Sequence, residues 1–391
     1  MNYDKALSED VVIRRQRLQT TMQEMNIDAC MLSTGINIFY MTGQIYNGYF
    51  YLPAEGDAIH FVKRPEGVTL EGTVYIRKPE QIVDELQKLG MKCPSQLLLE
   101  TEVLSYSECG RVMKTFGVES VGNASTILRR QRSVKSLFEV DQIRACARKH
   151  EAVYKQIPSI FRRGMTDLEL QIEIEYLMRL HGSLGIFRSY GENMDIYMGS
   201  LLVGENAEAA SPYDYALGGA GMSPTLPLGA NGAPIKEGAA IMVDMAGNYS
   251  PWMTDMTRVF SVGKTSDIAY RAHNVAAEIH QVVMDMVKPG VSCADLYNVA
   301  YDIVRRNDLE HYFMGTKQQA KFIGHGLGLE INEPPVLTPR SKELLEENIV
   351  FALEPKFVIP EVGAVGFENT YLVTESGVEK LTVLDENIIE L

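Results

Sequence analysis

The chain has 391 residues, with 37 basic and 51 acidic side chains and a formal net charge of −14. Because a single hydrophobic core stops growing at about 250–300 residues, this length predicts two domains. The acidic balance argues against a nucleic acid or an anionic membrane surface as a partner. No stretch reaches the roughly 18 apolar residues of a transmembrane helix, so we expect no membrane association.

The five cysteines are scattered along the chain and form no CxxC pair, and the first residues contain no apolar signal segment. This pattern is typical of reduced thiols in an intracellular protein. We therefore expect a cytoplasmic protein without disulfides.

The first part of the chain alternates between helical and strand-like patterns, as in a small α/β domain. Helices are predicted over 11–26 and 79–90, and short apolar runs predict strands over 28–33, 36–43, 48–53, 57–62 and 96–100. The basic stretch LRRQRSVK (128–135) separates this part from the rest. We place the first domain at 1–132 and the second at 136–391, beginning with a long helix over 136–156.

The second part contains a weak internal repeat. The segment that starts at Gly164 has a hydroxyl residue two positions later, an acid three beyond that, and then a leucine, and the segment from Gly290 repeats this order. The first segment fits a helix capping box and the second is a close variant. Any helix can start this way, but a duplicated αβ unit would explain both segments.

Five residues of metal-binding type recur in this second part: Asp244, Asp255, His325, Glu354 and Glu368. Four carboxylates and one imidazole form an oxygen-rich set that suits two divalent cations, with Mn²⁺ preferred and Co²⁺ or Zn²⁺ as alternatives. Two such ions at about 3.5–4 Å from each other can activate a water molecule and polarise a carbonyl group. The Gly-His-Gly-Leu-Gly run around His325 also imitates a dinucleotide fingerprint, but no βαβ pattern surrounds it.

The local context of the carboxylates predicts a rigid site. Asp244 ends one apolar run and Asp255 opens another, and the turn between them is rich in Gly, Asn and Pro, which indicates a β-hairpin. Glu354 and Glu368 also adjoin apolar, strand-like runs. Ligands on strands are held more firmly than ligands on loops.

Taken together, the order Asp-x10-Asp, Gly-His-Gly, Glu-Pro and Glu-Asn-Thr resembles the M24 metallopeptidases, which include aminopeptidase P, prolidase and creatinase. Asp255 is followed by Met-Thr-Arg258, which is similar to the D-x-T-R motif of that family. The resemblance implies an α/β chain with a creatinase-type N-terminal domain and a catalytic αβ domain of pita-bread fold with pseudo-twofold symmetry. It also implies that Asp255 and Glu368 bridge two metals, that Asp244 holds one, and that His325 and Glu354 hold the other.

The sequence departs from that family at positions that handle protons or substrate. The stretch upstream of Asp244 that should carry a histidine is SPTLPLGANGAP, and the two further histidine positions are Lys321 and Asn332. Gly366 stands where an arginine is common. We therefore expect Glu354 and Asn332 to take catalytic roles, as a possible proton carrier and as a hydrogen-bond donor. Tyr190, Asn193 and Glu333 are candidate substrate-binding residues.

Three functions remain open at this stage. The first is a dinuclear Xaa-Pro dipeptidase or aminopeptidase P relative that cleaves a small peptide amide with a metal-bridging hydroxide. The second is a metal-dependent hydrolase of another small amide or modified amino acid, with the missing histidines marking a changed pocket. The third is a metal-binding protein without peptidase activity. A homodimer is the expected assembly.

Overall fold

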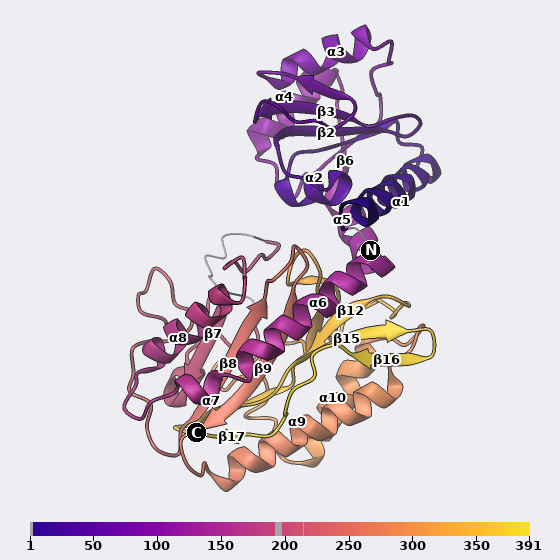
Figure 1. Cartoon of the computed structure of the whole chain (residues 1–391). Coiled ribbons are helices and arrows are strands. Elements are labelled where there is room, and N and C mark those ends of the chain that lie inside the picture. Colours follow the sequence, from indigo (N-terminus) through magenta and orange to yellow (C-terminus); the bar gives the residue numbers. More distant parts are fainter. Residues whose placement is uncertain (1–2, 192–197, 214) are drawn as a thin grey trace. The chain divides into compact units, whose positions relative to one another are not determined.

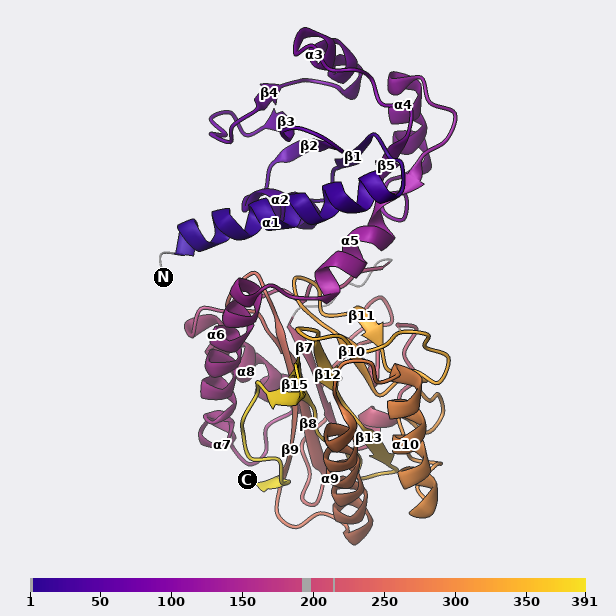
Figure 2. The ribbon, with the colours of Figure 1, turned by 90° about the vertical axis from the view of Figure 1, so that its right-hand side faces the viewer.

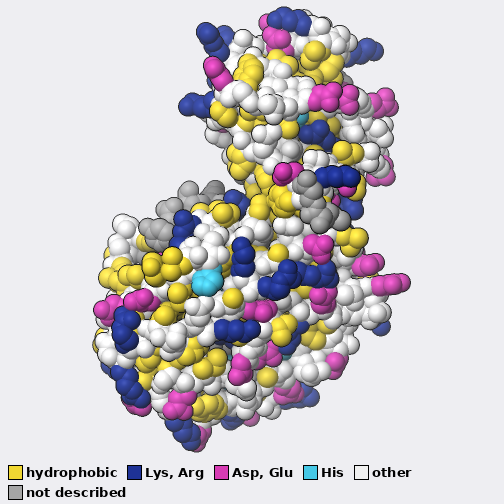
Figure 3. Space-filling view, in the orientation of Figure 1, with side chains coloured by type: hydrophobic (Ala, Val, Ile, Leu, Met, Phe, Trp, Pro, Cys, Tyr) yellow, Lys and Arg dark blue, Asp and Glu magenta, His cyan; other side chains and the backbone are white. Residues whose placement is uncertain are grey.

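The structure is a computed structural model that describes residues 3–191, 198–213 and 215–391 (Figure 1). Contacts between residues divide the chain into two compact units, Met1–Arg132 and Ser133–Leu391. None of the described helices combines the length and the apolar composition needed to cross a membrane. Acidic and basic side chains are mixed on the face of each unit shown in Figure 3, so the negative charge is not gathered into one patch there.

The first unit is built around a six-stranded mixed sheet with the order β4-β3-β2-β1-β5-β6. Its buried core consists of alternate strand residues such as Met31, Tyr51 and Phe61, together with apolar residues of the flanking helices. Its helices and strands are α1 (Tyr3–Glu24), β1 (Ala29–Leu32), α2 (Gly35–Thr42), β2 (Asn47–Pro53), β3 (Ile59–Arg64), β4 (Thr73–Tyr75), η1 (Pro79–Gln81), α3 (Ile82–Lys88), β5 (Leu97–Leu99), α4 (Tyr106–Phe116), β6 (Gly122–Asn123) and α5 (Ala124–Ser133).

Two sequence expectations in this unit were wrong. The run 36–43 forms helix α2 and not a strand, because Thr34 is extended before the helix and Gly43, at φ 79°, ends it in the left-handed conformation that glycine tolerates. A short apolar run fits a buried helix as well as a strand, and here the flanking residues decide. The first helix begins at Tyr3, well before the expected residue 11.

The second unit contains α6 (Leu137–Tyr154), α7 (Ile157–Ile160), α8 (Asp167–Leu180), β7 (Gly199–Val203), η2 (Gly204–Glu208), β8 (Ala240–Gly247), β9 (Thr254–Ser261), α9 (Asp267–Met286), α10 (Cys293–Arg306), β10 (Gly324–Gly326), β11 (Glu333–Val336), β12 (Val350–Leu353), β13 (Lys356–Ile359), β14 (Gly363–Gly366), β15 (Asn369–Thr374), β16 (Gly377–Lys380) and β17 (Ile389–Glu390). The sheets have the orders β17-β9-β8-β7, β11-β10-β12-β15-β16 and β13-β14. Helices α6, α7 and α8 lie on one side of the strands, and α9 and α10 lie on the other (Figures 1 and 2).

This unit consists of two similar halves. The first half runs from α6 to β9 and the second from α9 to β16; in each, two long helices, α6 and α8 or α9 and α10, precede a strand pair, β8–β9 or β12–β15. Helices α8 and α10 start in the same way. Gly164 and Gly290 have φ near 90°, and the capping residues Thr166 and Ser292 each form an isolated antiparallel bridge to the segment that leads into the first strand.

The expected β-hairpin around the turn 248–253 is confirmed. Strands β8 and β9 are antiparallel, with Asp244 opposite Thr257 and Asp255 opposite Ala246. The two aspartates are therefore fixed on neighbouring central strands of one sheet. Glu354 follows the last residue of β12, and Glu368 precedes the first residue of β15, which are paired strands of the other sheet.

Candidate metal centre

The five ligands expected from the sequence lie together where the two halves meet. The side-chain ligand atoms of Asp255, His325 and Glu368 lie within 4.8 Å of one another, a spacing that suits one metal ion. The Nε2 atom of His325 is 3.3 Å from Glu354 Oε1 and 3.8 Å from Asp255 Oδ2. Asp244 joins the cluster through a shared partner, the Nζ atom of Lys356, described below.

Each half fixes the ligand of the other through a threonine. Thr257, two residues after Asp255, donates a hydrogen bond of 2.7 Å from its hydroxyl to Glu368 Oε2. Thr370, two residues after Glu368, donates 2.8 Å to the carbonyl oxygen of Asp255 and accepts 2.9 Å from the Asp255 amide. All four residues are buried. Groups that orient ligands in this way tune metal affinity as well as geometry.

Arg258 strengthens the same junction. Its buried guanidinium donates to the carbonyl oxygens of Thr257 and Glu368, at 2.7 and 2.8 Å, and to the side-chain oxygen of Asn369 at 2.8 Å. One planar group thus ties β9 to the residues around Glu368 on the second half. The arginine that closes the D-x-T-R-like motif acts here on the backbone and not on a ligand atom.

The cluster contains one residue, Lys356, that was not among the site residues expected from the sequence. The side chain of Lys356 is fully buried, and its ammonium donates to Asp244 Oδ2 at 2.8 Å, Glu354 Oε2 at 2.7 Å and Glu368 Oε2 at 3.2 Å. A signal for it was present. Lys356 stands two residues after Glu354 in an otherwise apolar run, and residues two apart in an extended chain face the same side.

Burial and mutual repulsion shape the protonation of the acids. Burial raises the pKa of Asp255 well above its ordinary value, and the neighbouring carboxylates of Glu368 and Asp244 add to the effect. Burial and the charge of Glu354 raise the pKa of Glu368 to about 8. These shifts are those of a cluster with more negative charge than the surrounding protein compensates, which favours a bound cation.

The neighbouring carboxylates also raise the pKa of the two basic groups. Burial alone would lower the pKa of Lys356, but Asp244, Glu354 and Glu368 raise it well above its usual range. For His325, burial is outweighed by the hydrogen bond to Glu354, which raises the pKa of the imidazole to about 9. Burial works against ionisation of Glu354, yet Lys356 and His325 lower the pKa of that carboxyl to about 2.

One carboxylate oxygen of the cluster lacks a hydrogen-bond partner among the described residues. Glu368 Oε1 is buried and has no hydrogen-bond partner among the described residues, whereas Glu368 Oε2 accepts from Thr257 and Lys356. Leaving a buried carboxylate oxygen without a partner is costly, so native structures rarely do so without an ion or a water. A divalent cation held by Asp255, His325 and Glu368 fits this atom and the chemistry of its neighbours.

The other predicted site residues are Asn332 and Glu333, shortly after His325 in sequence, and Tyr190 and Asn193, far before it. The side-chain amide of Asn332 accepts from the backbone N–H of Tyr190 and donates to its carbonyl oxygen, both at 2.7 Å. Glu333 is buried, forms an ion pair with Lys135 at 2.9 Å and accepts from the Leu329 amide. Asn193 lies outside the described residues. The substrate-binding and catalytic roles expected for these side chains stay predictions.

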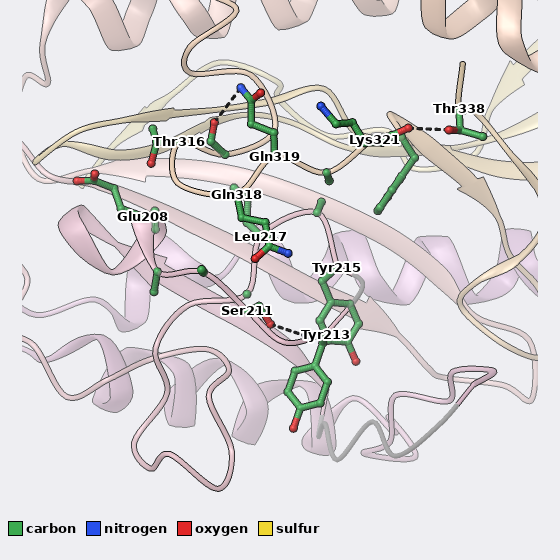
Figure 4. A pocket seen from close by; sticks show the side chains of 18 of the residues that line it. Glu208, Ser211, Tyr213, Tyr215, Leu217, Thr316, Gln318, Gln319, Lys321 and Thr338 are labelled. Carbon is green, nitrogen blue, oxygen red and sulfur yellow. Dashed lines mark hydrogen bonds between the residues drawn. The ribbon is translucent and has the colours of Figure 1, made fainter. Parts of the chain in front are cut away.

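A pocket of about 320 Å³ lies in the second unit (Figure 4). It is lined by residues between 207 and 218 and between 315 and 322, together with Val336 and Thr338. Tyr213 and Tyr215 come from the first segment, and Gln319 and Lys321 come from the second. The ring of Phe322, which also lines the pocket, lies edge-on to the imidazole of His325 with 6.3 Å between ring centres. The volume is in the range of small-molecule sites, at about 300–1,000 Å³.

Comparison with known families agrees with this arrangement. Residues 141–375, more than half of the chain, match metallopeptidase family M24. The chain belongs to metallopeptidase family M24. This membership makes it a metallopeptidase-type hydrolase, and it confirms the family resemblance seen in the sequence. Residues 14–134 match the creatinase/prolidase N-terminal domain.

Individual M24 relatives are distant but similar over their full length. An Xaa-Pro dipeptidase of Pyrococcus furiosus is 25% identical, with 96% of this chain and 99% of the relative covered. The structure of X-Pro aminopeptidase from Thermotoga maritima has a TM-score of 0.78 at 22% identity, covering 96% and 99%. That of Xaa-Pro dipeptidase from Bacillus anthracis has a TM-score of 0.79 at 22% identity, covering 97% and 100%. The expected creatinase-type domain and pita-bread fold are thereby confirmed.

Proposed function

We propose that this M24 protein is a metal-dependent peptidase that cleaves small peptides of the Xaa-Pro type. The observation that carries the proposal is the buried group of Asp255, His325 and Glu368, in which Glu368 Oε1 has no hydrogen-bond partner among the described residues. Relatives that are named Xaa-Pro dipeptidases and match over nearly their whole length support it.

The roles of the chain's residues follow from their positions. Asp255, His325 and Glu368 would hold a divalent ion, with Asp244 and Glu354 at the edge of the same cluster. When bound, such an ion supplies Lewis acidity toward a peptide carbonyl and lowers the pKa of a water molecule. Thr257 and Thr370 keep the ligand carboxylates aligned, because each hydrogen-bonds to the ligand of the other half.

The pocket supports a small, polar substrate. Lys321 is exposed at its wall and offers a positive charge to the terminal carboxylate of a short peptide. Tyr213 and Tyr215 provide flat apolar surface with hydroxyl groups for orientation. We assign peptide binding to this pocket and to the neighbouring segment around Tyr190, with Glu333 holding the 329–330 backbone in place.

A second candidate function is hydrolysis of another small amide, and the environment of Asn332 favours it. Both polar atoms of its amide bond to the Tyr190 backbone, and an amide cannot carry a proton. Glu354 is held ionised by Lys356 and His325, which works against a proton-carrier role. The chain's seven histidines all lie in the described ranges, and none except His325 forms an ion pair with the cluster.

Kinetics on a substrate panel tests both candidates. Purified protein with Mn²⁺ is assayed on Xaa-Pro dipeptides and tripeptides and on small non-proline amides, with chelated protein as control. A kcat/KM of about 10⁴ M⁻¹s⁻¹ or more on an Xaa-Pro peptide supports the peptidase. A comparable value only on another amide supports the second candidate. Metal binding with no hydrolysis of any member would leave a metal-binding protein without peptidase activity and refute both.

The variant Asn332→His separates the candidates further. If the pocket still binds Xaa-Pro peptides, the imidazole introduced at residue 332 should raise kcat on them by up to about 10²-fold. That is the lower end of the range for general acid–base catalysis. If the pocket has changed its substrate, the variant should give no increase. Manganese as the preferred ion, a homodimer and a cytoplasmic location are further proposals; metal titration, light scattering and cell fractionation test them.

A further inference from the structure

The chain carries a permanent cation inside the cluster that was expected to hold two metal ions. The three N–H bonds of the Lys356 ammonium are directed at three carboxylate oxygens from three different residues, Asp244, Glu354 and Glu368. An ammonium has three donors, so this set uses all of them. The distances of 2.7–3.2 Å are those of charge-assisted hydrogen bonds.

Of the three acids, Asp244 was expected to hold one ion, Glu354 the other ion together with His325, and Glu368 to bridge both, so the ammonium lies on the Asp244 side of the cluster. The group that remains within reach of one ion is Asp255, His325 and Glu368. Glu368 divides its two oxygens between the two positions: Oε2 faces Lys356, and Oε1 is buried with no hydrogen-bond partner among the described residues. One dication and one ammonium would offset three of the four carboxylate charges. A second dication would have to bind beside the ammonium and share its oxygens, and like charges in a buried site repel strongly.

The backbone of Lys356 is held closely by the neighbouring strand. Lys356 begins β13, and its register partner on β14 is Gly366, at φ 108°. A Cβ atom at residue 366 would overlap the carbonyl oxygen of Pro355 and lie 3.0 Å from the Cα atom of Lys356. The absence of a side chain there lets the two strands approach closely, and it fixes the start of β13 directly behind the cluster.

We propose that the Lys356 ammonium takes the place of one of the two metal ions, so that this M24 protein binds a single divalent cation at Asp255, His325 and Glu368. The inference rests on the proposed function because it takes the bound ion to be a divalent metal. It does not depend on which reaction the protein catalyses. Its measure is the number of ions per chain, which does not depend on finding the substrate.

Metal stoichiometry tests the proposal directly. Full-length protein is stripped with a chelator, reloaded with Mn²⁺ and desalted, and the ions per chain are counted by elemental analysis. Wild type should hold one ion, with the electron paramagnetic resonance spectrum of an isolated Mn²⁺ and not of an exchange-coupled pair. Lys356→Ala, which removes the ammonium, should hold two ions and show the coupled spectrum.

Two control variants separate the charge of Lys356 from general damage. Lys356→Arg keeps a cation and should remain at one ion. Lys135→Met removes another buried lysine, which is paired with Glu333 outside the cluster, and should also remain at one ion. If Lys356→Ala does not fold, a wild-type count of two ions or of none still overturns the proposal.

Several results would overturn the proposal. Two tightly held ions in wild type would mean that the ammonium moves aside and serves only as a charge next to a metal pair. No ion in wild type, or one ion in both wild type and folded Lys356→Ala, would show that Lys356 does not occupy a metal position. A wild-type protein with one ion and no peptidase activity would refute the proposed function and leave this inference intact.

Discussion

In the first half of the Ser133–Leu391 unit, Asp244 lies opposite Thr257 on the paired strand; in the second half, Ala352 lies opposite Thr370, the counterpart of Thr257. Glu354 and Lys356 follow Ala352 by two and four residues, whereas Ala246 and Asn248 follow Asp244 at the same spacings. Two similar strand pairs thus carry their acids at different positions, and only the second half adds a cation. The comparison teaches that the shared scaffold brings the ligands together, and that single side chains decide what they hold.

The symmetry extends to the helices that support the strands. His150 and His280 each lie thirteen residues beyond the first residue of their helices, α6 and α9. His150 hydrogen-bonds through Nδ1 to Thr254 on β9 at 3.1 Å, and His280 through Nδ1 to Tyr371 on β15 at 2.9 Å. Both imidazoles are buried. In each half, therefore, a histidine on a helix is hydrogen-bonded to a strand next to the cluster: β9 contains Asp255, and β15 directly follows Glu368.

The largest effects should come from the matched pair Asp255→Ala and Glu368→Ala. If the halves contribute equally to one ion, each variant should lose more Mn²⁺ affinity than the roughly 10–100-fold that is typical when a residue hydrogen-bonded to a metal ligand is replaced. Hydrolysis should disappear in both. Calorimetric Mn²⁺ titration measures the affinity, and Asp285→Ala, at an exposed acid on α9, is the control. Retention of the ion by either variant would contradict the shared role.

The second-largest effect should be a loss of folding stability at low pH, to which both halves contribute. Burial lowers the pKa of His150 and of His280 to about 3, from 6.5. Below 6.5 the unfolded chain binds protons that the folded chain does not, so stability is full above that pH and falls as pH decreases. Each histidine should cost about 1.4 kcal/mol per pH unit in that window. Urea unfolding, followed by the fluorescence of the single, buried Trp252 in this unit, measures the slope.

The symmetry gives this pH experiment its internal control. His150→Gln and His280→Gln should each reduce the slope between pH 6.5 and about pH 5 by about 1.4 kcal/mol per pH unit, because either histidine accounts for one proton. A slope that only one of the two variants reduces would show that the halves unfold separately.

A smaller effect should distinguish the two threonines. Thr257→Val removes a hydrogen bond to a ligand oxygen, whereas Thr370→Val removes bonds to the backbone of a ligand. We expect Mn²⁺ affinity to fall by about 10–100-fold for Thr257→Val and by less for Thr370→Val. Thr382→Val, at a buried threonine that bonds Asn369 and the Thr370 amide but no ligand, is the matched control. Equal losses in all three variants would mean that only strand stability is being measured.

Much of this site could be predicted from residues that act locally. The hairpin was visible because its turn residues separate two apolar runs, and the ligands because their order and chemistry are specific. The run 36–43 was assigned wrongly because its helical state depends on a glycine in a left-handed conformation. The place of Lys356 beside Glu354 could be read from their spacing, but its contacts with Asp244 and Glu368 could not be predicted, because they form only when the strands fold together. The paired bridges at Thr166 and Ser292 likewise exist only in the folded backbone.

The spread of the ligands along the chain also sets when an ion can first be bound. Asp244 and Asp255 are synthesised early, but Glu368 emerges from the ribosome close to the end of the chain, after Lys356. The ammonium is therefore present before the last ligand arrives and can neutralise Asp244 and Glu354 while the strands assemble. Metal loading becomes a step that follows folding and does not drive it. The refolding rate, read from Trp252, should accordingly be the same with and without Mn²⁺.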